Sequence, residues 1–109
     1  MSFSPHECIR HILVETEYIV SHCRGVTFDE FVGDETLRRA VVRSLEIIGE
    51  PAKKLPEDFR AFHPQIEWKA MSGLRDRLIH GYFGVDYELV WEIKESRIPL
   101  LGQQIRTIL

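Results

Sequence analysis

The segment from Gly73 to Gly84 carries several side chains that can move protons or bind anions, within eight positions. They are Arg75, Asp76, Arg77, His80 and Tyr82. Histidine titrates near neutral pH and can act as an acid or a base, and arginine binds phosphate oxygens through its planar guanidinium group. Cleaving RNA without a metal needs a base for the 2′-hydroxyl proton, an acid for the leaving oxygen and a cation beside the phosphate. The segment therefore has the residue types that phosphodiester cleavage requires.

A structural explanation of the same residues also remains open. Asp76 and Arg77 can form a surface ion pair, and His80 can stabilise a helix C-terminus, where the helix dipole favours a cation. Tyr82 can simply pack beside a glycine turn. Residue types alone therefore allow either a catalytic or a structural role.

The spacing of apolar residues predicts that the cluster ends a helix over 64–80. Residues four apart share a helix face, so Asp76 would accept a hydrogen bond from His80 and orient it. Arg75 and His80 are five apart, about 140° around the helix axis. They meet only if the helix end unwinds or if a second copy of the chain supplies one of them.

Helical periodicity extends along the whole chain of 109 residues. Four long helices are predicted, together with a connector and a short extra helical turn. The helices cover 5–24, 34–52, 64–80 and 86–108, the connector 27–33 and the extra turn 56–62, and Pro99 is expected to kink or divide the last helix. No stretch alternates with a period of two. The expected fold is all-α, an up-and-down four-helix bundle in a single domain over 1–109.

Composition limits the possible classes of protein. With 44% apolar and 28% charged residues the chain is typical of globular proteins, and no apolar run is long enough for a membrane span. The first residues lack the pattern of a secretion signal, so cytoplasmic residence is expected. The net charge of −3 provides no general attraction for nucleic acid. Any such binding needs a local patch, and Arg38, Arg39 and Arg43 form either that patch or a solvated helix face.

A metal site near the N-terminus is the weaker interpretation of a further cluster. The candidate ligands all fall in the first predicted helix: His6, Cys8, His11, His22 and Cys23. The close paired spacings of zinc motifs are missing, and Cys23 lies on the apolar stripe. We therefore expect core thiols and surface histidines, with no metal and no cofactor.

Three segments resemble one known family. Residues 75–80, RDRLIH, fit the arginine–histidine signature of the HEPN ribonuclease superfamily. With Tyr82 added, the segment resembles the arginine-x4-histidine-x-tyrosine motif of the HepT toxins. Residues 43–50 resemble the second helix of that family, and residues 86–93 resemble the start of its last helix. Because the three segments occur in the family's order, the chain is identified as HepT-like along nearly its whole length.

The resemblance implies a four-helix HEPN domain that forms a homodimer, with the motif of each subunit facing the interface. It implies a metal-independent ribonuclease toxin, neutralised by an MntA-like nucleotidyltransferase antitoxin that attaches AMP to the motif tyrosine. Arg75 and His80 would then be the catalytic pair, Asp76 and Arg77 supporting residues, and Tyr82 the AMP acceptor. The alternative is a non-catalytic helical partner, or a nucleotide-binding module, that docks a nucleotidyltransferase.

Overall fold

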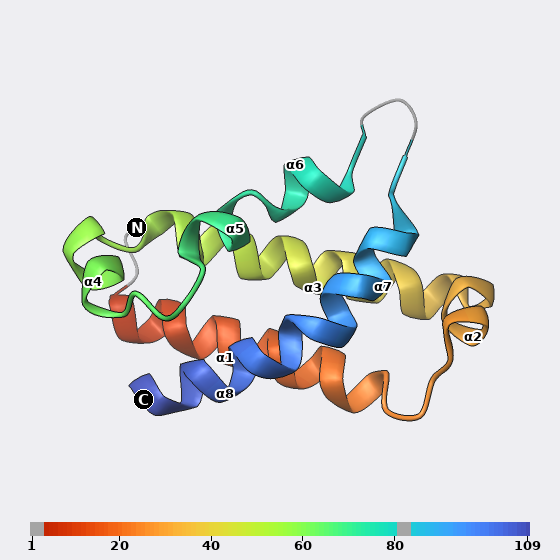
Figure 1. Ribbon diagram of the computed structural model, residues 1–109, viewed down its shortest axis with the longest axis horizontal. Coiled ribbons are helices and arrows are strands. Elements are labelled where there is room, and N and C mark those ends of the chain that lie inside the picture. Colours follow the sequence, from red (N-terminus) through yellow and green to blue (C-terminus); the bar gives the residue numbers. More distant parts are fainter. Residues whose placement is uncertain (1–3, 81–83) are drawn as a thin grey trace.

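The computed structural model describes residues 4–80 and 84–109, which form a bundle of helices (Figure 1). Every regular element in this part of the chain is helical, which confirms the all-α prediction. The helices are α1 (Pro5–His22), α2 (Phe28–Gly33), α3 (Glu35–Lys54), α4 (Glu57–Phe62), α5 (Trp68–Ser72), α6 (Leu74–Leu78), α7 (Tyr87–Ser96) and α8 (Ile98–Ile108). None of the helices in the described ranges has the length and apolar character of a bilayer span.

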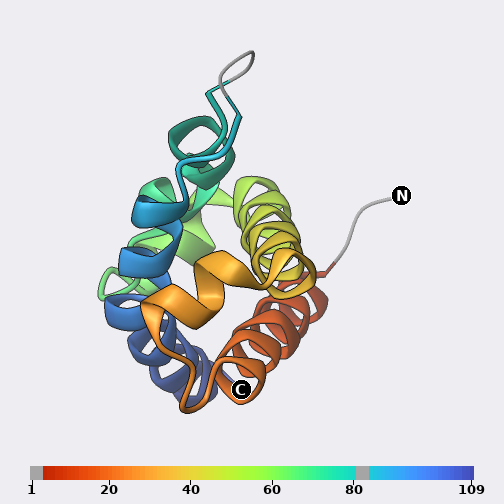
Figure 2. The ribbon, with the colours of Figure 1, turned by 90° about the vertical axis from the view of Figure 1, so that its right-hand side faces the viewer.

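The helices form four rods that alternate in direction, namely α1, α3, α5 with α6, and α7 with α8 (Figure 1). α1 packs against α3 and α8, and α3 also packs against α5 and α6. Buried apolar side chains from these rods form one core. When the bundle is seen from its end, α2 crosses that end (Figure 2), where Phe31 is fully buried. The motif helix α6 is thus held by α3 on one side of the core.

The predicted starts of three rods are confirmed by their caps. The Ser4 hydroxyl, the Asp34 carboxylate and the Asp86 carboxylate each accept a hydrogen bond from a backbone N–H in the first turn of α1, α3 and α7 respectively. Such caps satisfy N–H groups that lack partners within the helix. The break expected near Pro99 is also confirmed, because α7 and α8 separate at Arg97.

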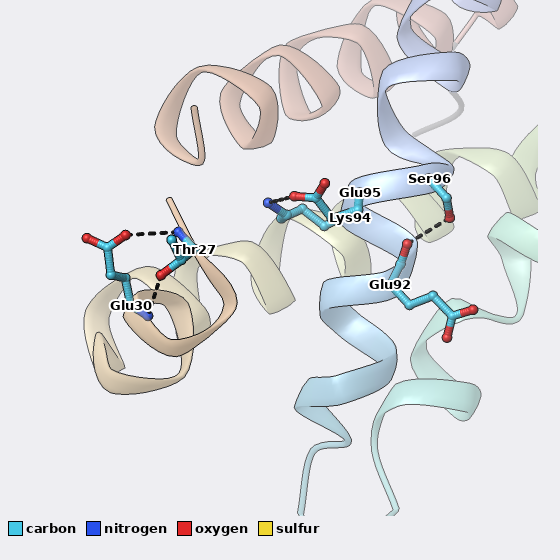
Figure 3. Close-up of polar contacts among 6 residues, drawn as sticks. All are labelled: Thr27, Glu30, Glu92, Lys94, Glu95 and Ser96. Atoms are coloured by element: carbon cyan, nitrogen blue, oxygen red, sulfur yellow. Dashed lines mark hydrogen bonds and ion pairs between the residues drawn. The ribbon is translucent and has the colours of Figure 1, made fainter. Parts of the chain in front are cut away.

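The connector predicted over 27–33 is in fact a helix, α2. A reciprocal capping box starts it (Figure 3): Thr27 Oγ1 accepts from the Glu30 N–H, while the Glu30 carboxylate accepts from the Thr27 N–H. The backbone hydrogen bond from Thr27 lowers the pKa of the Glu30 carboxyl group. The Thr-x-x-Glu spacing was visible in the sequence and is a known helix-start signal.

A lysine without a predicted role lies inside the bundle on α7. Lys94 is only 5% exposed, and its ammonium lies 3.7 Å from the centre of the Trp91 ring. It also forms an ion pair with Glu95 at 2.7 Å (Figure 3). Because the rings of Phe28 and Phe31 contact the same tryptophan, Trp91 connects α2 to α7. The cation–π contact lets the bundle bury a positive charge that would otherwise be costly.

The prediction of a single helix over 64–80 is wrong. Pro64 lies in a turn rather than in a helix, and α5 begins only at Trp68. The indole N–H of Trp68 donates to the carbonyls of Arg60 and His63. Gly73 then separates α5 from α6. The motif therefore starts on a helix of only five residues.

Candidate functional site

Arg75 lies on the exposed side of α6 and faces α3. Its guanidinium Nε is 3.7 Å from Oε2 of Glu46, and the Arg75 side chain is 65% exposed. Glu46 is the more buried partner, with 23% of its side chain exposed. An exposed ion pair of this kind contributes little to stability. The guanidinium therefore remains accessible to an anion from solvent.

His80 lies beyond the end of α6, in a short paired segment. The helix ends at Leu78, Ile79 forms an antiparallel bridge with Val85, and the His80 N–H donates to the Gly84 carbonyl at 2.8 Å. Gly84 has φ +84°, a conformation that glycine adopts without steric cost. The helix end therefore unwinds into an extended chain, one of the two possibilities that the five-residue spacing had left.

The carboxylate beside His80 is that of Asp86, not Asp76. His80 Nε2 lies 3.8 Å from Asp86 Oδ2, and the two side chains are 52% and 40% exposed. Because His80 is not on the helix, the expected four-residue relationship with Asp76 does not form. The sequence had identified Asp86 only as a helix cap, since its approach to His80 depends on the pairing of two loop segments.

Asp76 and Arg77, the predicted supporting residues, are both exposed on α6. Neither forms an ion pair with any described residue, so the surface ion pair that the structural explanation allowed is not formed. Arg77 faces a different side of α6 from Arg75 and lines a cavity of ≈ 160 Å³, together with apolar residues such as Leu74 and Leu101. The side chains of Arg75 and Arg77 therefore lie on different surfaces of the protein.

Arg75 and His80 each have a separate carboxylate partner, and no hydrogen bond or ring contact joins them within the described part of the chain. Both side chains are accessible to solvent, as a site for a large polyanion requires. Tyr82 lies outside the described residues, so its predicted role as AMP acceptor stays a prediction.

Two of the three arginines on the possible basic face of α3 are engaged in contacts within the chain. Arg38 donates to the Val32 carbonyl and lies over the Tyr87 ring, 5.1 Å from its centre. Arg39 pairs with Glu35 at 2.8 Å. Arg43 is exposed and has no ion-pair partner among residues 4–80 and 84–109. Of the three, only Arg43 is therefore exposed without an ion-pair partner among the described residues.

The N-terminal histidines and cysteines do not meet. His6, His11 and His22 are exposed on α1, whereas Cys8 and Cys23 are buried. Burial raises the pKa of both thiols, which favours their protonated form. The described residues contain no group of three or more histidine, cysteine or acidic side chains with the geometry of a metal site.

Comparison with known proteins identifies the family. Residues 12–108 match the family model described as Ribonuclease HepT-like. A relative named "Putative RNase TTE0752", from Caldanaerobacter subterraneus subsp. tengcongensis, is 47% identical over 97% of this chain and 95% of its own. A second, named "Probable ribonuclease HepT", from Thermococcus cleftensis, is 41% identical over 93% of this chain and 92% of its own. No solved structure matches the chain. The chain belongs to the ribonuclease HepT-like family.

Proposed function

We propose that this protein is a metal-independent RNA endonuclease and the toxin of a toxin–antitoxin pair, with Arg75 and His80 as its catalytic residues. The names of its relatives support a ribonuclease, since the two described above are named "Putative RNase TTE0752" and "Probable ribonuclease HepT". The observation that carries the residue assignment is the exposure of both motif side chains, 65% for Arg75 and 52% for His80. A buried pair could not reach the phosphates of a nucleic acid.

The proposed reaction is an internal transfer at phosphorus. His80 takes the proton of the 2′-hydroxyl, the 2′-oxygen forms a bond to phosphorus, and the bond from phosphorus to the 5′-oxygen breaks. The leaving 5′-oxygen receives a proton from solvent or from a second imidazolium. Arg75 stabilises the negative charge that builds on the phosphate oxygens, through its planar set of donors. Each proton and bond is thereby balanced without a metal.

The proposed active form is a homodimer. Within one chain Arg75 faces α3 while His80 lies beside the start of α7, and no contact joins them. A second copy can supply the complementary residue across an interface, because a two-fold dimer presents the same surface twice. Of the proposed supporting residues, Asp76 is exposed next to Arg75, whereas Arg77 faces a different side of α6 and would meet another part of a bound RNA.

Removal of the imidazole tests the nuclease proposal directly. The purified protein is expected to cleave RNA in the presence of EDTA, and His80→Ala is expected to abolish cleavage without lowering the melting temperature, because this side chain is half exposed. His6→Ala, which removes an exposed histidine from α1, is the matched control. Full cleavage by His80→Ala would reject the proposal. Absence of cleavage by the wild-type protein would favour the alternative, a non-catalytic partner that docks a nucleotidyltransferase.

Regulation is proposed to act at Tyr82. An MntA-like nucleotidyltransferase antitoxin would attach AMP to its hydroxyl, which would add a negative charge two positions along the sequence from His80 and repel RNA phosphates. Intact mass after co-expression with such an enzyme should show added AMP, which Tyr82→Phe should lose. Tyr87→Phe, which removes a hydroxyl at the start of α7, is the control and should keep the modification. Unchanged modification of Tyr82→Phe would place the acceptor elsewhere.

A further inference from the structure

Two backbone segments are held together where the motif ends. The Asp86 N–H donates to the Leu78 carbonyl at 2.9 Å, and the His80 N–H donates to the Gly84 carbonyl at 2.8 Å. Between these hydrogen bonds, Ile79 and Val85 form their antiparallel bridge. The backbone positions of His80 and Asp86 are therefore fixed relative to each other, although the two residues are six positions apart in the sequence.

The Asp86 carboxylate serves two neighbours at once. Its Oδ1 accepts a hydrogen bond from the Leu89 N–H at 3.1 Å and so caps α7. Its Oδ2 lies 3.8 Å from His80 Nε2. Because the cap holds one oxygen in place, the other oxygen is presented to the imidazole in a fixed direction.

We propose that Asp86 is the positioning residue for His80, holding the proton on Nε2 and leaving Nδ1 free to act as the base. This inference rests on the proposed nuclease function, but the orientation itself does not require activity. The two ring nitrogens are chemically distinct, and the hydrogen bond made by one decides which of them carries the proton. At 3.8 Å the contact is an ion-pair distance, and such contacts often shorten to hydrogen bonds when substrate binds.

The test replaces the carboxylate while keeping the cap. Asparagine and serine are both good N-cap residues, so Asp86→Asn and Asp86→Ser should leave α7 folded. An asparagine that keeps its oxygen on Leu89 turns an N–H₂ donor toward His80, which favours the opposite tautomer. Serine is too short to reach the ring. The ¹⁵N chemical shifts of the His80 ring report the tautomer, and cleavage kinetics report kcat and KM separately.

The matched control is Asp34→Asn. Asp34 caps α3 in the same manner, accepting from the Leu37 N–H at 3.0 Å, but it forms no ion pair with a histidine in the described part of the chain. A loss due only to capping would therefore appear in both helices. An effect on the His80 ring should appear only in the Asp86 variants.

The expected result is a shift of His80 toward the Nδ1-protonated tautomer in Asp86→Asn, with kcat lower by about tenfold or more and KM nearly unchanged. In Asp86→Ser, which leaves the ring without a partner, kcat should also fall while the ring keeps the Nε2-protonated tautomer that a free imidazole prefers. This loss is smaller than the 10²–10⁴-fold typical of removing a general base, since the imidazole remains. An unchanged tautomer in folded Asp86→Asn would overturn the proposal, even if His80 proves essential for cleavage. Conversely, a tautomer that depends on Asp86 in a protein that cleaves no RNA would reject the nuclease function and leave the positioning role intact.

Discussion

Glu46 and Arg75 join the two helices on which the proposed site depends. The carboxylate of Glu46 extends from α3 to within 3.7 Å of the Arg75 guanidinium on α6. The pair is largely exposed on the arginine side, so its contribution to folding is small. Its larger effect is on charge, because it partly neutralises the one motif arginine that faces α3. Bound RNA must compete with this carboxylate.

Removing the charge of Glu46 should strengthen RNA binding. In Glu46→Gln the Arg75 guanidinium loses its anionic neighbour, and affinity for a non-cleavable 2′-O-methyl RNA should rise by about two- to fivefold, as expected for an exposed ion pair. Fluorescence anisotropy at two salt concentrations measures this effect, which should shrink as salt screens the charge. Glu50→Gln is the control, because Glu50 pairs with Lys53 on the same helix. Weaker binding by Glu46→Gln would show instead that the carboxylate holds Arg75 in its working position.

Mixing two inactive variants tests whether each site is shared between subunits. If Arg75 of one subunit acts with His80 of the other, then exchanging Arg75→Ala and His80→Ala subunits creates heterodimers with one complete site. Half of the dimers would be of this kind, so about a quarter of wild-type sites should return. Cleavage assays before and after subunit exchange measure the recovery. If no activity returns although native mass spectrometry shows heterodimers, each site draws both residues from one chain.

Close packing at Gly49 is expected to be essential for the position of the rod formed by α5 and α6. A methyl group added at Gly49 would lie 2.9 Å from the Met71 carbonyl oxygen, a backbone atom that cannot move without shifting α5. Gly49→Ala should therefore destabilise the protein by about 1–3 kcal/mol and lower the melting temperature by roughly 5–15 °C. Gly33→Ala is the control, since nothing lies within 4 Å of its added methyl group. Equal melting temperatures for the two variants would contradict this account of the α3–α5 contact.

Local patterns in the sequence were enough to predict the fold class and the starts of α1, α3 and α7. The stripes of apolar residues in α1 and α3 follow the 3.6-residue period, and Ser4, Asp34 and Asp86 are caps whose effect is confined to one helical turn. Proline likewise acts locally, so the division near Pro99 was predictable. The family assignment was also predictable, because it depends on the order of residues along the chain.

The three-dimensional arrangement around the motif was decided by tertiary contacts. Whether the chain remains helical up to His80 depends on its pairing with a segment near Val85, and local propensity carries no information about such a partner. This pairing places Asp86 beside His80. The packing of α6 on α3 places Glu46 beside Arg75. The sequence by itself determined which residues are proposed to carry the chemistry. Only the folded chain decided which carboxylate lies beside each of them, because ion pairs between separate elements form only after those elements have packed.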